Sequence, residues 1–230
     1  MTLDPRSAAA TALLFLCLLT AASPAARAQT NAAAPVPAQD PASVAFCDGC
    51  HGADKLAQDA TVPDLGGQGA EYLQKQLLDF MRNVRAMLAR RDESRNYTGQ
   101  RDNVTMHPNA QAITESDAVD LAKIFAARAC HQTVPPPPRP ASVPAVRARC
   151  EACHRDDGKG DKGTVVPRLA GQSSPYLFNQ LNSMRRAALG LVVPGTASER
   201  SHPIMNAELK ELEIADLRTL ADYFAGLPCK

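Results

Sequence analysis

Apolar residues recur at helical spacing in two matching stretches, one in the middle of the chain and one at its end. The first stretch predicts a helix that begins at Thr114, because Asp117 three residues later completes a pair of side chains typical of helix starts. The second predicts a helix that ends at Gly226 and Pro228. The two apolar stripes consist of Val119, Leu121, Ile124 and Phe125, and of Ile214, Leu217, Leu220, Tyr223 and Phe224.

Two further helices are predicted from their starting residues. Asp40 is expected to cap a helix whose first residue is Pro41 and which runs into a pair of cysteines. Ser174 and Pro175 begin another helix in the same way. No segment of useful length alternates apolar and polar residues, so we expect an all-α fold.

The N-terminal segment has the pattern of a secretory signal. An apolar run over residues 8–22 follows a short positive start, and Ala-Arg-Ala at residues 26–28 is typical of a cleavage site. We predict a signal peptide over residues 1–28 and a disordered lead-in over residues 29–39; a retained N-terminal anchor is the alternative. No later stretch approaches the roughly 20 apolar residues of a membrane-spanning helix, so none is expected in the mature chain.

The same module occurs twice in the remaining sequence, at offsets of 99 to 104 residues. We therefore predict two domains of similar build, residues 40–132 and 142–230, joined by a Pro-rich, semi-rigid linker over residues 133–141. The matching segments are Cys47-Asp-Gly-Cys50-His51 and Cys150-Glu-Ala-Cys153-His154; Pro63-Asp-Leu65-Gly-Gly67-Gln68 and Pro167-Arg-Leu169-Ala-Gly171-Gln172; Tyr72-Leu73 and Tyr176-Leu177; and Met106, Leu121, Phe125 and Cys130 with Met205, Leu220, Phe224 and Cys229.

Composition and charge restrict the classes of function. The chain has 25 Lys and Arg against 24 Asp and Glu, a formal net charge of +1, which provides no basic field for nucleic acid. Aromatic residues make up only 4% of the chain and there is no Trp. A domain of about 90 residues would be marginal with so few large side chains, so we infer that another group fills each core.

The two Cys-x-x-Cys-His motifs indicate what that group is. Two thiols three positions apart add to the vinyl groups of a haem, and the histidine that follows presents a ring nitrogen to the iron. A zinc ribbon needs Cys pairs about 15–20 residues apart, a thioredoxin-like dithiol needs a βαβ context, and a disulfide within each motif leaves the histidines unexplained. We therefore predict two covalently bound haem c groups. The predicted attachment residues are Cys47, Cys50, Cys150 and Cys153, and the predicted iron ligands are His51 and His154.

An iron held by one histidine has either a second axial ligand or an open site. Met106 and Met205 occupy matching positions, in predicted loops ahead of the last helix of each domain, from which a thioether reaches over the haem. Packing of these methionines in the core is the alternative. His107 and His202 are competing ligands, but they do not match across the repeat, so we favour methionine at both irons.

Four other matched residues are candidates for the surroundings of the haems. The carbonyls of Pro63 and Pro167 are suited to accept the second ring N–H of the iron-binding histidines; a simple loop turn is the alternative. Tyr72 and Tyr176 either bury their rings against haem and hydrogen-bond a propionate, or pack in the core. His131, beside the linker, is expected to be solvated.

With these motifs in order, residues 40–230 resemble the dihaem cytochrome c4 family of bacterial periplasmic electron carriers. The resemblance implies two tandem class I cytochrome c domains, whose haems lie close together across a pseudo-twofold interface. It also implies His/Met ligation of both irons, with His51 and Met106 on the first and His154 and Met205 on the second. The chain departs from the family in a longer Arg-rich loop, residues 82–101, in His107-Pro108 after the first methionine, and in Leu209, where the family has alanine.

Cys130 and Cys229 are left over, one at the end of each domain. Unpaired thiols are a liability in an oxidising compartment, and equivalent positions near a pseudo-twofold axis come close to each other, so we hypothesise a disulfide between the domains. Intermolecular pairing and two free buried thiols are the alternatives.

The leading interpretation is a periplasmic protein that carries electrons one at a time. Its expected partners are a quinol-oxidising complex, a terminal oxidase or a periplasmic reductase. The alternatives are a haem enzyme similar to dihaem peroxidases, with one open iron, and the electron-entry subunit of a dehydrogenase.

Overall fold

The computed structural model describes residues 41–53, 59–88, 101–132, 136–191 and 198–230. The predicted signal peptide, the lead-in and Asp40 lie outside these residues. None of the helices in the described part of the chain is long and apolar enough to cross a membrane.

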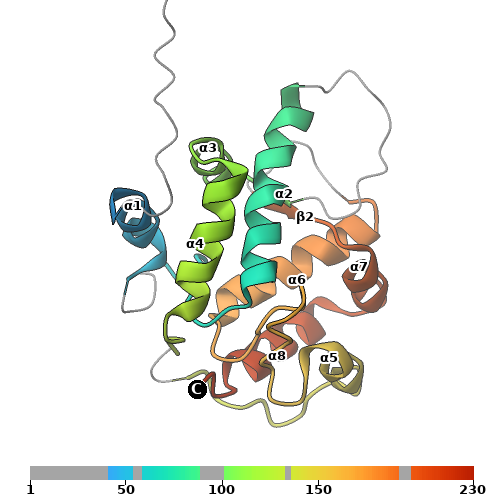
Figure 1. Ribbon diagram of the computed structural model, residues 1–230. Helices are drawn as coiled ribbons and strands as arrows, with labels where there is room; N and C mark the ends of the chain where they lie inside the picture. The colour runs from blue at the N-terminus through green and yellow to red at the C-terminus, as the bar shows by residue number, and fades with distance from the viewer. Residues whose placement is uncertain (1–40, 54–58, 89–100, 133–135, 192–197) are drawn as a thin grey trace, which may run out of the picture. The chain divides into compact units, whose positions relative to one another are not determined.

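The described elements follow the same order in both repeats (Figure 1). The first repeat contains α1 (Pro41–His51), α2 (Ala70–Leu88), β1 (Arg101–Asn103), α3 (Met106–Gln111) and α4 (Glu115–Ala127). The second contains α5 (Arg147–His154), α6 (Ser174–Ala188), β2 (Ser198–Arg200), α7 (Pro203–Leu209) and α8 (Ile214–Ala225). Residues 136–140 of the Pro-rich segment form neither helix nor strand.

The predicted all-α fold is confirmed, with one small addition. β1 and β2, one from each repeat, form a two-stranded antiparallel ribbon in which Arg101 pairs with Arg200. Three residues are too few to show an alternating pattern, which is why the sequence did not predict these strands.

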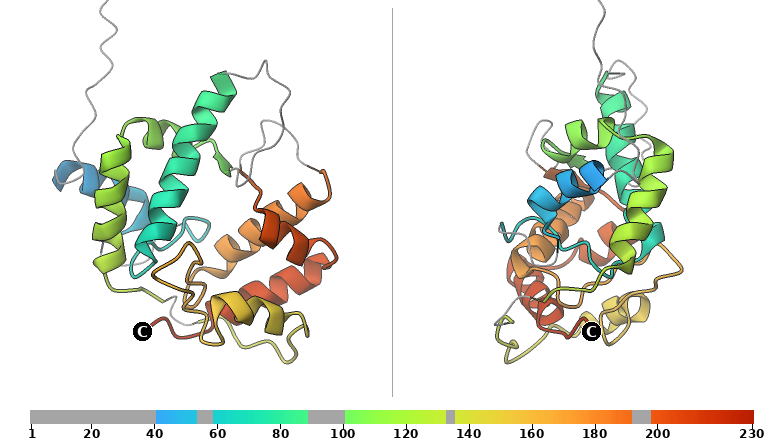
Figure 2. Two further views of the ribbon diagram at one scale, coloured as in Figure 1. Left: turned by 45° about the vertical axis from the view of Figure 1, so that its right-hand side comes forward. Right: turned by 60° about the vertical axis from the view of Figure 1, so that its left-hand side comes forward.

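Each repeat is built around a pair of long helices. α2 lies beside α4 in the first repeat and α6 beside α8 in the second, as the views in Figures 1 and 2 agree. Most of the apolar stripes predicted for α4 and α8 face these contacts, but Ile214 at the start of α8 is exposed and Tyr223 is only partly buried. The buried core residues on the four helices include Tyr72, Leu73, Leu121, Ala122 and Phe125, and Tyr176, Leu177, Met184, Leu217, Leu220 and Phe224.

The ends of these helices test the predicted signals. α4 begins after Thr114 with a capping box to Asp117, and α8 ends at Gly226, as predicted. α6, however, is capped by Ser173 and not by Ser174. The Ser174 hydroxyl instead donates to Asp222 on α8, a contact between helices that no local pattern reveals.

The prediction of a loop over the Arg-rich residues 82–101 is wrong at both ends of this range. Residues 82–88 continue α2, and Arg101 lies in β1, while residues 89–100 are outside the described part of the chain. The helix continues because Arg, Met, Leu and Ala are all strong helix formers. The extra length of the first repeat therefore lengthens α2 to 19 residues, against 15 for α6.

Candidate haem sites

Each Cys-x-x-Cys-His motif forms the C-terminal end of a short helix, α1 in the first repeat and α5 in the second. His51 and His154 are the last residues of these helices, and both side chains are buried. The helix therefore presents two thiols on successive turns and turns the imidazole inward beside them.

A backbone carbonyl holds each of these rings. His51 Nδ1 lies 2.9 Å from the carbonyl oxygen of Pro63, and His154 Nδ1 lies 3.0 Å from that of Pro167. A carbonyl oxygen only accepts hydrogen bonds, so Nδ1 carries the proton and donates it. In the neutral ring the lone pair is then on Nε2, the atom that a metal ion needs.

The electrostatic surroundings keep both rings neutral. Burial lowers the pKa of His51 and of His154, and this effect outweighs the hydrogen bonds to the two carbonyls, which act in the opposite direction. Arg101 lowers the pKa of His51 further, and Arg200 does the same for His154. Each site therefore holds a neutral imidazole with a fixed tautomer.

The four motif cysteines are free thiols with the same asymmetry in each repeat. Cys47 and Cys150 are partly buried, whereas Cys50 and Cys153 are exposed. Burial raises the pKa of Cys47, with Asp48 adding to the effect, and burial together with Glu208 raises that of Cys150. Two thiols and one imidazole lone pair at the end of a helix are the donor set that a covalently attached iron porphyrin requires, so the residues present fit haem c.

The candidate distal methionines lie in short helices, and the prediction of loops at these positions is wrong. Met106 is the first residue of α3, and its backbone N–H donates to Asn103 Oδ1 at 2.9 Å. Met205 is the third residue of α7, which Pro203 begins. Helices of six and seven residues are too short to show a clear apolar period, so the sequence did not reveal them.

The competing histidines have other contacts. His202 caps α7, and its Nδ1 accepts the backbone N–H of Met205 at 3.5 Å. Burial lowers the pKa of His202, with Lys75 and Arg200 contributing, and a neutral ring that accepts at Nδ1 carries its proton on Nε2. This contact holds the His202 ring at the start of α7.

His107 is directed toward α2. Its Nδ1 lies 3.1 Å from the carbonyl oxygen of Phe80, and its buried ring meets the Phe80 ring edge-on. Neighbouring residues of a helix point about 100° apart, so the contact of His107 with α2 turns Met106 to a different face of α3.

Comparisons with known proteins agree with this geometry. The cytochrome c family profile matches residues 145–227. Cytochrome c4 of Azotobacter vinelandii is 26% identical over 194 residues, which cover 80% of this chain and 85% of that protein. The solved structure of Acidithiobacillus ferrooxidans cytochrome c4 superimposes with a TM-score of 0.51 at 25% identity, over 80% of this chain and 99% of the other. The thiosulfate dehydrogenase electron acceptor of Stutzerimonas stutzeri is 29% identical over 207 residues, 82% of this chain and 81% of that one.

The matches run through both repeats and cover between 81% and 99% of these proteins. The chain is similar to the cytochromes c4 along both repeats. It is a dihaem cytochrome c that transfers electrons, with two covalently bound haem c groups.

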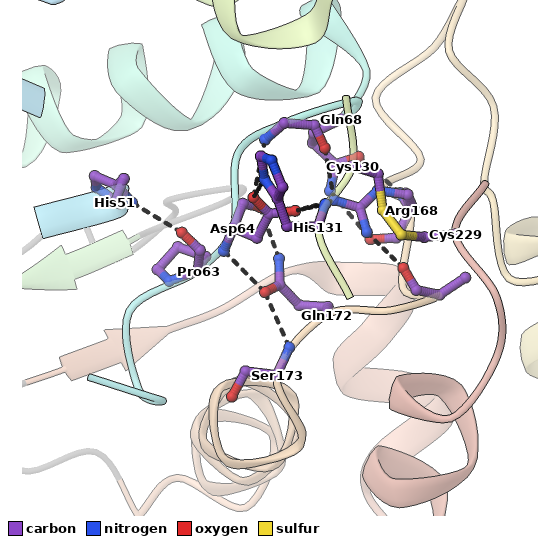
Figure 3. Close-up of polar contacts among 12 residues, drawn as sticks. His51, Pro63, Asp64, Gln68, Cys130, His131, Arg168, Gln172, Ser173 and Cys229 are labelled. Carbon is purple, nitrogen blue, oxygen red and sulfur yellow. Dashed lines mark hydrogen bonds and ion pairs between the residues drawn. A yellow bond between two sulfur atoms is a disulfide. The ribbon is translucent and has the colours of Figure 1, made fainter. Parts of the chain in front are cut away.

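In this cytochrome the two repeats are joined through the glutamines of the Pro-x-Leu-x-Gly-Gln motifs (Figure 3). Gln68 donates to the carbonyl oxygen of Arg168 at 3.0 Å and accepts the Arg168 backbone N–H at 2.7 Å. Gln172 makes the reciprocal pair of hydrogen bonds with the backbone of Asp64, each at 2.9 Å. The four hydrogen bonds relate the two repeats by a pseudo-twofold axis, and the sequence motif did not reveal this role.

A buried ion pair lies between the two glutamines. Arg168 Nη2 is 3.1 Å from Asp64 Oδ2, and both side chains are only 3% exposed. Arg168 also donates to the carbonyls of Gly66 and Ala170. Asp64 further binds His131, whose Nδ1 lies 3.3 Å away with the side chain 23% exposed, so the expectation of a solvated His131 is wrong.

The leftover cysteines lie beside this interface. The structure joins Cys130 and Cys229 by a disulfide with a Cα–Cα distance of 6.1 Å (Figure 3). Gly67 and Gly171 pack on it with positive φ values of 68° and 69°. A Cβ at Gly171 would lie 2.7 Å from the Cys229 sulfur, so both the backbone conformation and the close approach require glycine.

The two matched tyrosines are buried and make crossed contacts between the repeats. Arg200, in the second repeat, donates to Tyr72 Oη at 3.0 Å, and Arg101, in the first, donates to Tyr176 Oη at 2.8 Å. Sequence reasoning missed both arginines. They match at an offset of 99 residues, the same offset as Met106 and Met205, and this was the signal that would have found them.

Proposed function

We propose that this cytochrome is a periplasmic carrier that passes single electrons between respiratory complexes through two His/Met-ligated haems. In this proposal His51 and Met106 bind the first iron, and His154 and Met205 bind the second. Cys47, Cys50, Cys150 and Cys153 form the thioethers. The haem supplies the one-electron change of its iron, and the chain sets the ligands, the burial and the surrounding charge.

The observation that carries this proposal is the repetition of the histidine geometry. Both proximal candidates have a neutral ring, Nδ1–H directed at a proline carbonyl, and Nε2 left with the lone pair. Met106, the first residue of α3, and Met205, the third residue of α7, match each other in the sequence repeat, and this match favours two six-coordinate irons over an enzyme with an open iron. The signal peptide and the boundaries of the two domains remain part of the proposal.

The identity of the electron donor admits a second candidate. One relative is named as the electron acceptor of a thiosulfate dehydrogenase. A thiosulfate dehydrogenase of Marichromatium purpuratum also superimposes on 80% of this chain at 29% identity and a TM-score of 0.56, although this chain covers only 36% of it. A dehydrogenase of this kind is therefore the specific alternative to a quinol-oxidising complex.

Stopped-flow reduction of the purified ferric protein tests the two donors. The protein is mixed separately with a quinol-oxidising complex plus quinol, and with a thiosulfate dehydrogenase plus thiosulfate. A carrier is reduced at both haems by at least one donor and is reoxidised by a terminal oxidase. A protein that consumes peroxide, or binds carbon monoxide at one ferrous haem, contradicts the carrier and supports an open-iron enzyme.

A further inference from the structure

A cavity of about 580 Å³ lies beside the disulfide, and residues of both repeats line it. Both cysteines of the disulfide belong to this lining. Five of the nine described residues that line the cavity are basic and none is acidic; the basic residues are Arg128, Lys159, Lys162, Arg168 and Lys230. The volume is typical of a small-molecule site, and walls that carry one sign of charge attract an ion of the opposite sign.

Part of this positive charge is compensated within the protein. Arg128 forms an ion pair with Asp48, and Lys159 donates to the backbone oxygen of Lys230 at 3.0 Å. The side chains of Lys162 and Lys230 are in a different situation. Both residues are exposed, and none of the ion pairs found in the described part of the chain includes either of them. Two ammonium groups of the lining therefore lack an opposite charge.

Arg168 contributes a buried donor to the same lining. Its terminal amino groups donate to Asp64 and to two backbone carbonyls, but its buried Nε has no hydrogen-bond acceptor. Burial lowers the pKa of Arg168 more than Asp64 raises it, so this one carboxylate does not fully compensate the guanidinium group. A buried N–H without an acceptor is unfavourable. Figure 3 shows the Arg168 side chain next to the disulfide that lines the cavity.

We propose that this cavity binds a small divalent oxyanion of the sulfate or phosphate class. The anion accepts hydrogen bonds from the Nε–H of Arg168 and from the ammonium groups of Lys162 and Lys230. An oxyanion with several oxygen atoms can meet several donors at once, and such charge-assisted hydrogen bonds are stronger than neutral ones. The site goes beyond the proposed function, because its ligand needs neither a haem nor an electron-transfer partner.

The test uses the full-length mature holoprotein in its ferrous, diamagnetic state. Sulfate and inorganic phosphate are titrated separately by isothermal calorimetry, while sodium chloride keeps the ionic strength constant, so that general screening does not change. Lys162→Gln and Lys230→Gln each remove one ammonium donor. Lys123→Gln is the matched control, because it removes the same charge from a side chain that is 68% exposed and is not part of the cavity lining.

We expect the wild-type protein to bind one sulfate or phosphate ion per chain. Lys162→Gln and Lys230→Gln are each expected to weaken binding about tenfold, which corresponds to the loss of one charge-assisted hydrogen bond, whereas Lys123→Gln binds like the wild type. The anion binds the folded state, so it also raises the unfolding temperature of the wild type and of Lys123→Gln. The increase is smaller in the two cavity variants.

The Nε–H of Arg168 reports the position of the anion directly. Its resonance in ¹H–¹⁵N spectra of the ferrous protein is assigned through its bonds to the Arg168 backbone. We expect this resonance to shift as sulfate is added, with the same concentration dependence as the calorimetric binding, because the N–H gains an acceptor.

Absence of saturable binding of both anions overturns the inference. Binding that Lys123→Gln weakens as much as the cavity variants also overturns it, because the anion then responds only to net charge. Binding without a shift of the Arg168 Nε–H resonance places the anion elsewhere and contradicts the proposed site. None of these results bears on the proposed function, which haem content and electron transfer test separately.

Discussion

Asp64 and Arg168 occupy the same position of the repeated motif, and they form a buried ion pair with each other across the interface between the repeats. A pseudo-twofold axis brings equivalent positions together, so identical charged residues there would repel. The divergence of one position to Asp and the other to Arg makes the two repeats complementary. It also disfavours pairing of two first repeats or two second repeats from separate chains.

Removal of one partner of this pair is expected to be costly. Asp64→Asn leaves Arg168 buried without its counter-charge, and we expect the free energy of unfolding to fall by about 3–5 kcal/mol. Denaturant titration of the holoprotein measures this. Asp120→Asn is the control, because the Asp120–Lys123 pair is 3.9 Å apart and Lys123 is 68% exposed. We expect at most about 1 kcal/mol there. Equal losses in the free energy of unfolding of the two variants contradict the claim that burial makes the loss of Asp64 costly.

Gly171 and Gly190 distinguish two reasons why a position requires glycine, a positive φ and the close approach of neighbouring atoms. Both have positive φ, 69° and 68°, but Gly171 lies against Cys229, whereas a Cβ at Gly190 meets nothing within 4 Å. Gly190→Ala is expected to cost about 1 kcal/mol of backbone strain. Gly171→Ala adds a clash with the disulfide, a further 1–3 kcal/mol or so. Thermal or denaturant unfolding measures both losses of stability. An equal loss in the two variants contradicts the claim that close packing against Cys229 requires glycine at position 171.

The Cys130–Cys229 disulfide closes a long stretch of chain, 99 residues apart in sequence. The double variant Cys130→Ser, Cys229→Ser is expected to lose about 2–5 kcal/mol of stability, because the unfolded chain is no longer constrained. Alkylation of unreduced, denatured wild-type protein checks the bond itself. It should label neither cysteine, and the appearance of two labelled thiols excludes the bridge.

The distal ligand of the second haem is tested by two neighbouring substitutions. Met205→Leu removes the thioether, so one haem is expected to lose its ferric long-wavelength sulfur–iron absorption band and its potential is expected to fall. His202→Ala removes the cap of α7, which costs about 0.5–2 kcal/mol, but keeps both bands. The reverse result, in which His202→Ala and not Met205→Leu abolishes a band, assigns the iron to histidine.

The sequence predicted the features that local patterns carry. Cys47, Cys50 and His51 lie within five residues, and the capping box of Thr114 with Asp117 spans one turn of helix. Spacings this short can be recognised from the sequence alone. The ion pair of Asp64 with Arg168 joins residues 104 positions apart, and only the fold brings them together.

Position in the fold also explains the errors. His131 looked like a linker residue, but it lies against Asp64 because the disulfide draws the end of α4 toward the interface. The missed arginines, Arg101 and Arg200, lie in three-residue strands whose pairing is a contact between the repeats. Comparison of every charged residue at the repeat offset would have shown their correspondence, though not their contacts with the tyrosines.

The central claim is that each repeat holds one covalently attached haem. The most direct measurement is the intact mass, under denaturing conditions, of the protein purified from bacteria that mature c-type cytochromes. The account predicts the mass of the chain from residue 29 onward plus two haems. A chain that carries one haem or none, with free thiols at Cys47 and Cys50 or at Cys150 and Cys153, contradicts it.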